Sequence, residues 1–184
     1  MGLSRDEFES LYRAHASEIL GYLRRRGAGE DAQDLLAETF LTAWRRRHAL
    51  PDADLRRAWL FGTARRLLLA LHRGKQFTVL TGEAETWAAG PPDPDHDDRN
   101  ADVVRAALAD LPEVDRELLT MTVWERLPVV DAGAALGLTA SAARVRLHRV
   151  RRRLASDPRL FELLDAAGAD PPAVLEAAAD RAGN

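Results

Sequence analysis

The sequence predicts an all-α protein in which two small helical domains are joined by a flexible acidic linker. Over residues 5–26, apolar side chains recur at steps of three and four, which is the period of an amphipathic helix. Residues 76–99 lack this period and combine prolines with aspartates, which is typical of a linker. Farther along, Gly137 and Thr139 separate two helical patterns in the manner of a helix-turn-helix. The expected boundaries are residues 1–75 and 101–155 for the domains, 76–100 for the linker and 156–184 for an acidic tail.

Positive charge is concentrated in the two predicted domains, although the whole chain carries a formal net charge of −3. Residues 1–75 contain 14 Lys and Arg against 10 Asp and Glu, and residues 99–154 contain 10 against 7. Residues 76–98 contain none against 6, and residues 155–184 contain 2 against 6. The positive electrostatic potential that attracts phosphate groups is therefore confined to the two domains, which indicates a nucleic-acid partner.

The composition excludes several classes of site and location. The 184-residue chain has no cysteine, so we expect no disulfide, thiolate metal site or cysteine nucleophile, which fits a reducing cytoplasm. No signal region opens the chain, and no apolar run approaches the roughly 20 residues of a membrane span. We find no P-loop, zinc signature or catalytic constellation, and the aspartates of residues 93–98 are spaced unlike a calcium loop. The sequence therefore predicts a cytoplasmic, non-enzymatic protein without a membrane span, cofactor or metal.

Three helices are predicted in the first domain. The first covers residues 5–26 and ends at Gly27. The second begins near Asp31, a residue suited to capping, and ends in an arginine run before the turn at residues 50–52. The third covers residues 54–71 and carries arginines around its apolar face. Because each apolar face needs a partner, we expect a compact bundle of three or four helices.

The second domain ends in a strongly basic helix over residues 138–154, with six arginines among residues 144–153. Gly137 ends the preceding helix, and Thr139 is placed to cap this one. A basic helix alone is as consistent with a solvated surface as with DNA contact, but the preceding helix and turn favour DNA. The predicted core stripe is Ala143, Leu147, Val150 and Leu154, and the predicted exposed side is Ser141, Val145, His148, Arg149 and Arg152.

Three sequence blocks resemble one protein family. Residues 34–44 read DLLAETFLTAW, similar to the pattern DLxQETFLxAW, and residues 59–69 read WLFGTARRLLL, similar to WLFxIARNLLL. Residues 111–119, 124–127 and 146–154 are similar to the second domain of the same family. In these blocks, which keep the family's order, the chain resembles bacterial RNA polymerase sigma factors of the extracytoplasmic-function type, within the sigma-70 family.

This resemblance implies a function and a set of partners. Such factors bind core RNA polymerase, recognise the −35 and −10 elements of double-stranded promoter DNA, and assist an opening that exposes single-stranded −10 DNA. The resemblance also implies an anti-sigma protein that clamps both domains. Two other functions stay open on the residues alone: a helix-turn-helix repressor or activator that works without polymerase, and a sigma-like adaptor whose DNA-reading helix has drifted.

The resemblance assigns the helix of residues 34–44 to polymerase docking. Docking requires an exposed helix face that mixes apolar and acidic groups, while Phe40 and Trp44 turn inward. The alternative is that Leu35, Phe40 and Trp44 are all core residues, whose loss acts through folding. The candidate polymerase-binding residues are Asp34, Leu35, Glu38, Thr39, Leu41 and Thr42.

Two further surfaces are assigned to DNA. The loop of residues 48–57 is the natural place for a base extruded from the stack, and the arginines at its end and beyond it suit phosphates. In the second domain, the N-terminal half of the basic helix enters the major groove. The candidate −10 residues are Leu50, Asp52 and Asp54 in the loop, with Arg56, Arg57, Arg65, Arg66, Arg73 and Lys75 on phosphates. The candidate −35 residues are Thr139, Ser141, Arg144, Val145 and His148, with Arg146, Arg149 and Arg152 nearer phosphates.

Some departures from the family pattern are expected to matter. Ala132 and Gly133 shrink the core contact of the first helix of the helix-turn-helix, and Val145 stands where a serine is common. The smaller expected effect is a changed sequence preference at the −35 element, and the larger one is weak or lost recognition of that element. The tail carries an apolar patch and a further helical pattern from Pro171, and it folds back, binds a regulator or is disordered. The patch consists of Leu160, Phe161, Leu163 and Leu164.

Overall fold

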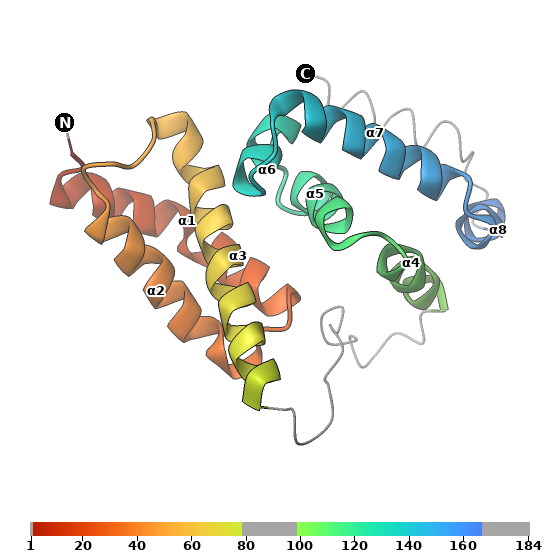
Figure 1. Ribbon diagram of the computed structural model, residues 1–184, viewed down its shortest axis with the longest axis horizontal. Helices are drawn as coiled ribbons and strands as arrows, with labels where there is room; N and C mark the ends of the chain where they lie inside the picture. Colours follow the sequence, from red (N-terminus) through yellow and green to blue (C-terminus); the bar gives the residue numbers. More distant parts are fainter. Residues whose placement is uncertain (1, 79–98, 167–184) are drawn as a thin grey trace. The chain divides into compact units, whose positions relative to one another are not determined.

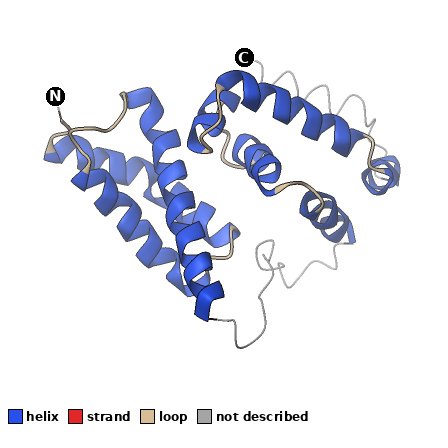
Figure 2. Cartoon of the chain, in the orientation of Figure 1, coloured by secondary structure: helices blue, strands red, loops and turns tan. Residues whose placement is uncertain are grey.

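A computed structural model describes residues 2–78 and 99–166 of the chain, with side chains over residues 2–74 and 102–163. These described segments are helical and contain no strand (Figure 2). The chain divides into two compact units between Pro92 and Asp93, and each unit is described by itself. The all-helical, two-unit architecture predicted from the sequence is therefore confirmed. No helix in the described segments is long and apolar enough to cross a membrane.

The first unit is a bundle of three helices in mutual contact (Figure 1). They are α1 (Arg5–Arg25), α2 (Ala32–Arg45) and α3 (Ala53–Thr78), with a 3-10 turn, η1 (Gly29–Asp31), before α2. Ser4 and Glu7 begin α1 with a capping box, in which each side chain accepts a hydrogen bond from the other residue's backbone N–H. Gly27, at φ 77°, follows the end of α1, as its position predicted.

Two local expectations in this unit are wrong. Asp31 precedes α2 but forms no side-chain capping bond, because its backbone is already helical at the end of η1. Helix α3 begins at Ala53 and continues to Thr78, past the end expected at residue 71 and into the segment assigned to the linker. The absence of a glycine or proline stop between residues 75 and 78 fits this continuation.

The core of the first unit joins all three helices. Ile19, Tyr22 and Leu23 of α1 are buried together with Leu60 and Phe61 of α3. The rings of Tyr22 and Phe61 pack edge to face, with centroids 5.3 Å apart. At the other end of α1, a second aromatic cluster ties it to α2, through ring contacts among Phe8, Tyr12, Phe40 and Trp44.

Over residues 99–166, the second unit contains the helices α4 to α8. They are α4 (Arg99–Ala109), α5 (Glu113–Val123), α6 (Val129–Ala135), α7 (Ala140–Ala155) and α8 (Pro158–Ala166). Helices α5, α6 and α7 pack together, and α4 packs against α8. Gly137, at φ 74°, lies in the turn that follows α6. The Thr139 hydroxyl caps α7 by accepting a hydrogen bond from the backbone N–H of Ala142. The predicted turn between the two helices is therefore confirmed.

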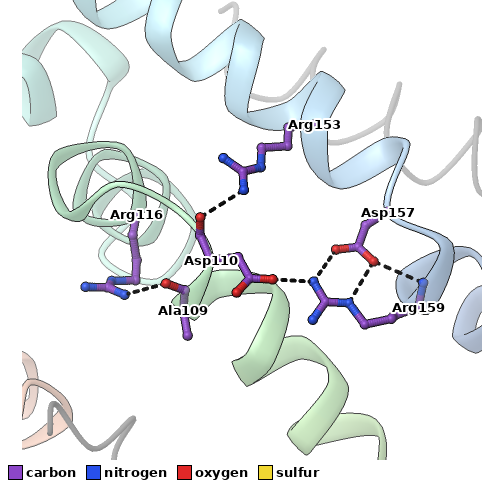
Figure 3. A network of polar contacts seen from close by, with 6 residues as sticks. All are labelled: Ala109, Asp110, Arg116, Arg153, Asp157 and Arg159. Carbon is purple, nitrogen blue, oxygen red and sulfur yellow. Dashed lines mark hydrogen bonds and ion pairs between the residues drawn. The ribbon is translucent and has the colours of Figure 1, made fainter.

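Helix α8 lies in the segment expected as a tail, yet it contacts both α4 and α7. Figure 3 shows the polar contacts at this junction. The Arg159 guanidinium pairs with the Asp110 and Asp157 carboxylates at 2.7 Å each, and Arg153 of α7 donates to the Asp110 carbonyl oxygen at 2.9 Å. Leu160 and Leu163 are half-buried and Phe161 is exposed. The Leu164 side chain, residues 79–98 and the pattern from Pro171 lie outside the described residues.

Candidate polymerase and DNA interfaces

The exposed face of α2 differs from the predicted one at two positions. Leu35 is 8% exposed and Thr39 is 0% exposed, and the Thr39 hydroxyl donates to the Leu35 carbonyl oxygen at 2.7 Å. Both residues were expected on the docking face, but they lie on the side of α2 that also buries Phe40. For Leu35 and Phe40, the alternative reading as core residues is thus supported; Trp44 is half-buried.

The remaining four candidates on α2 form one continuous stripe. Asp34 and Leu41 are exposed, and Glu38 and Thr42 are half-buried beside them. Their spacing of four, three and one places them on one side of the helix. The Glu38 carboxylate accepts a hydrogen bond from Arg45 at 3.1 Å, at the C-terminal end of the stripe. We call Asp34, Glu38, Leu41 and Thr42 the α2 stripe.

The connection between α2 and α3 is held at both ends. The backbone N–H of Leu3 donates to the Arg47 carbonyl oxygen at 3.0 Å, and Arg56 Nε donates to the Pro51 carbonyl oxygen at 3.2 Å. Leu50 is half-buried and Asp52 is exposed. Asp54, expected in this loop, instead lies in the first turn of α3, where a carboxylate is favoured by the helix dipole.

The arginines of α3 are not equally available to a phosphate. Arg57 donates to Glu18 through Nε at 3.0 Å and Nη2 at 3.4 Å, and its guanidinium lies 5.3 Å from the centre of the Phe61 ring. Arg66 donates to the Thr63 hydroxyl at 2.9 Å. Arg65 is half-buried and Arg73 is exposed. The Lys75 side chain lies outside the described residues.

Glu18 is the residue that holds Arg57. Burial opposes ionisation of its carboxyl group, but the hydrogen bonds from Arg57 and His15 outweigh burial and hold the pKa of Glu18 below its ordinary value. Because Glu18 and Arg57 are 39 residues apart, no local spacing in the sequence signals the pair. Sequence reasoning therefore missed Glu18.

Helix α7 separates its two faces as its period predicted. Ala143, Leu147 and Val150 are buried, whereas Val145 is 48% exposed. Leu154 is half-buried. Burial lowers the pKa of the flanking Arg151, which was not assigned to DNA. The exposed side carries Ser141, Arg144, Val145, His148, Arg149 and Arg152.

Three candidate −35 residues have polar contacts inside the unit. The Thr139 hydroxyl caps α7 and lies 3.2 Å from the Ser141 hydroxyl. Arg146 Nε donates to Asp115 Oδ1 on α5 at 2.8 Å. Asp115 is a second residue that sequence reasoning missed, since 31 positions separate it from Arg146. In the segments that the structure describes, no group of three His, Asp or Glu side chains is placed to hold a metal ion.

Two family models match the chain, one on each unit. Residues 11–78 match Sigma-70 region 2, and residues 101–154 match Sigma-70, region 4. The first match contains the α2 stripe and the whole of α3, and the second contains α6 and all but the last residue of α7.

Proteins similar over about three quarters of the chain give the same family. The ECF RNA polymerase sigma factor SigF of Caulobacter vibrioides is 33% identical over 142 residues, which cover 74% of this chain and 77% of SigF. The ECF RNA polymerase sigma factor SigL of Mycobacterium tuberculosis is 29% identical over 151 residues, covering 79% and 85%.

A solved structure has the same fold. The sigma factor RpoE of Bartonella quintana, in complex with the anti-sigma factor NepR, aligns with a TM-score of 0.61 at 20% identity. The alignment covers 81% of this chain and 94% of that one. With both sigma-70 regions present and SigF aligned over most of its length, this chain belongs to the family of ECF RNA polymerase sigma factors.

Proposed function

We propose that this sigma factor docks on core RNA polymerase through its first unit and divides promoter recognition between its two units. The observation that carries the proposal is α7, which buries one face and exposes a cationic one directly after the Gly137–Thr139 turn. This helix lies within the match to region 4, and the α2 stripe lies within the match to region 2. In this proposal the first unit carries both the polymerase contact and the −10 surface, and the second unit carries the −35 surface.

The α2 stripe is the proposed polymerase contact. It presents the carboxylates of Asp34 and Glu38 beside the exposed Leu41. An apolar side chain ringed by charged groups is the usual composition of an interface centre and its rim. Leu35 and Thr39 support this surface from inside the bundle and do not contact the partner.

The connection between α2 and α3 is the proposed −10 surface. Its backbone is held by Leu3 and Arg56, so a base extruded from the duplex meets a preorganised loop that carries Leu50 and Asp52. Phosphate contacts there fix the register of the DNA and make binding depend on salt. The proposed phosphate contacts are Arg56, Arg65, Arg66, Arg73 and Lys75, with Arg57 held beside them by Glu18.

The exposed face of α7 is the proposed −35 surface. Ser141, Arg144, Val145 and His148 lie on its N-terminal half, which approaches base edges when such a helix enters the major groove. A single arginine that binds guanine with two hydrogen bonds contributes about 1–3 kcal/mol of discrimination. Arg149 and Arg152 lie farther along the helix and contact phosphates.

The same proposal covers regulation and location. The protein acts without catalysis or cofactor, in the cytoplasm with the polymerase. An anti-sigma protein is the proposed inhibitor, a suggestion supported by the likeness of this fold to a sigma factor solved with NepR.

Reconstituted transcription tests the proposal. The full chain is mixed with core polymerase and a library of genomic fragments, and transcripts are mapped at their start sites. We expect start sites that share a −35 and a −10 sequence and that are lost with an Arg144→Ala variant. Failure to bind core polymerase contradicts the proposal. Core binding without promoter-directed transcripts favours an adaptor, and tight specific binding of the free chain to duplex DNA favours a plain helix-turn-helix regulator.

A further inference from the structure

Arg146 and Asp115 join the DNA-reading helix to the start of α5. The Arg146 Nε and the Asp115 Oδ1 are 2.8 Å apart, which is a charge-assisted hydrogen bond. The Asp115 side chain is 20% exposed and that of Arg146 is 39% exposed, so the pair lies at the edge of the contact between α5 and α7. Asp115 lies in the first turn of α5, where the helix dipole favours the ionised carboxylate.

This bond uses the Nε–H of the Arg146 guanidinium and leaves the N–H groups of the two terminal nitrogens for another partner. A guanidinium carries five N–H groups in a rigid plane, and the two terminal nitrogens hold four of them. Asp115 is the single polar partner recorded for Arg146 in the part of the chain that the structure describes. The terminal nitrogens therefore keep the paired donors with which arginine binds phosphate.

The position of Arg146 on α7 suits a phosphate better than a base. It lies between the buried Leu147 and the exposed Val145, on the flank of the exposed face. When a recognition helix enters the major groove, its flanks lie nearest the sugar-phosphate backbone. A fixed guanidinium at this place loses less side-chain entropy on binding than a free one.

We propose that Asp115 is a positioning residue for the −35 contact, which orients Arg146 so that its terminal nitrogens donate to one DNA phosphate. The inference rests on the proposed function of the second unit. It opposes the simple electrostatic expectation, in which a carboxylate this close to DNA repels phosphates and neutralises Arg146. The two accounts predict opposite signs for removal of the Asp115 charge.

The test measures binding of holoenzyme to a labelled duplex. The duplex carries the −35 sequence that the wild-type chain, assembled with core polymerase, enriches from a random-sequence library. We expect Asp115→Asn to weaken binding by about three- to tenfold, because an amide oxygen accepts a weaker hydrogen bond from a guanidinium than a carboxylate does and so holds Arg146 less firmly. Glu113→Gln is the matched control, because it removes the same charge from the same turn of α5. It leaves binding unchanged or slightly tighter.

A double-mutant cycle separates positioning from packing. In an Arg146→Ala background, Asp115→Asn has no further effect on binding if Asp115 acts through Arg146. Arg146→Ala also makes the slope of log K against log salt concentration shallower by about one unit, because about one fewer counterion is released on binding. Arg146→Lys keeps much of this slope but binds DNA less tightly. Amide exchange across α5 and α7 shows whether each variant remains folded.

The outcomes are distinct. Unchanged or tighter binding by Asp115→Asn overturns the positioning role while leaving −35 recognition intact. An equal loss in the Arg146→Ala background also overturns it, since Asp115 then acts through the packing of α5. If the wild-type holoenzyme enriches no −35 sequence, both the proposed function of this unit and the inference fail.

Discussion

Gly133 of α6 lies against Ala143 of α7 so closely that a Cβ atom on Gly133 would be 2.5 Å from the Cβ of Ala143. Both residues are buried at the contact between the two helices of the helix-turn-helix. The small residues that were expected to shrink this core contact therefore allow a closer approach of the two helices. Packing at this point is retained, because the backbone of α6 takes the place of a side chain.

Substitution of Gly133 by alanine is expected to destabilise the second unit. Overlap of the two Cβ atoms costs about 1–3 kcal/mol, which exceeds the gain of about 1 kcal/mol or less from the better helix former. Amide exchange of α6 and α7 measures the loss. Ala143→Gly removes the overlap, so the double variant is more stable than the sum of the single effects predicts. Additive effects would show that the contact is not the cause.

Substitution of Leu35 is expected to affect folding, and substitution of Leu41 is expected to affect binding to core polymerase. Leu35→Ala removes a buried side chain and costs about 2–5 kcal/mol of unfolding free energy. Leu41→Ala changes stability by no more than about 0.5 kcal/mol because its side chain is exposed. It nevertheless weakens binding to core polymerase by about fivefold or more, as expected for an interface anchor. Unfolding by urea and anisotropy with labelled protein measure the two effects, and normal core binding by Leu41→Ala argues against the α2 stripe.

Val145 is expected to influence the choice of base and not the fold. Its side chain is 48% exposed, on the side of α7 that we propose faces the major groove. An apolar side chain there suits the methyl group of thymine, whereas a serine hydroxyl can donate a hydrogen bond to some bases and accept one from others. Val145→Ser should therefore relax a preference for thymine at one −35 position, with the other positions unchanged. Selection of DNA from a random-sequence library by wild-type and variant holoenzymes measures this preference. Identical selected sequences would refute a role of Val145 in the choice of base.

The Glu18 and Arg57 pair is expected to make a small, pH-dependent contribution to stability. The pKa of Glu18 in the folded chain lies below its ordinary value of 4.5, so the ionised form favours folding. This stabilisation is present above about pH 4.5 and is lost as pH falls below it. The side chain is 42% exposed, so the contribution stays below about 1 kcal/mol.

The comparison that checks this is wild type against Glu18→Gln. The difference in their unfolding free energies is largest near neutral pH and shrinks below pH 4.5. In an Arg57→Ala background the difference is smaller at every pH. A difference that grows as the solution is acidified has the wrong sign and would contradict the assignment.

Helix α8 is expected to stabilise α4. Truncation after Ser156 removes the helix against which α4 packs, together with the Arg159 pairs at the α4–α5 turn (Figure 3). Amide exchange across α4 should accelerate, while α6 and the N-terminal half of α7 keep their protection. Arg159→Ala, which removes only the two Arg159 ion pairs and leaves the helix in place, has a much smaller effect. Unchanged protection of α4 after truncation would show that α8 is dispensable to the unit.

Local patterns were sufficient where the neighbouring residues along the chain decide the structure. The period of α7 predicted that Ala143 and Leu147 are buried and that Val145 is exposed, because the geometry of a helix alone decides which side chains share a face. The turn at Gly137 and the cap at Thr139 were predictable for the same reason, since each depends on a few adjacent residues. The length of α3 was not predictable from the sequence, because no glycine or proline marks the end of this helix.

The sequence by itself determined the all-helical class, the two basic units and the family, since these depend on local period, composition and motif order. The tertiary structure decided which face of α2 is covered, and so placed Leu35 and Thr39 in the core. It also decided that Arg57 meets Glu18 and Arg146 meets Asp115, across 39 and 31 residues. The physical reason is that a charged side chain pairs with whatever packing brings within about 3 Å of it, and packing joins residues that no local pattern relates.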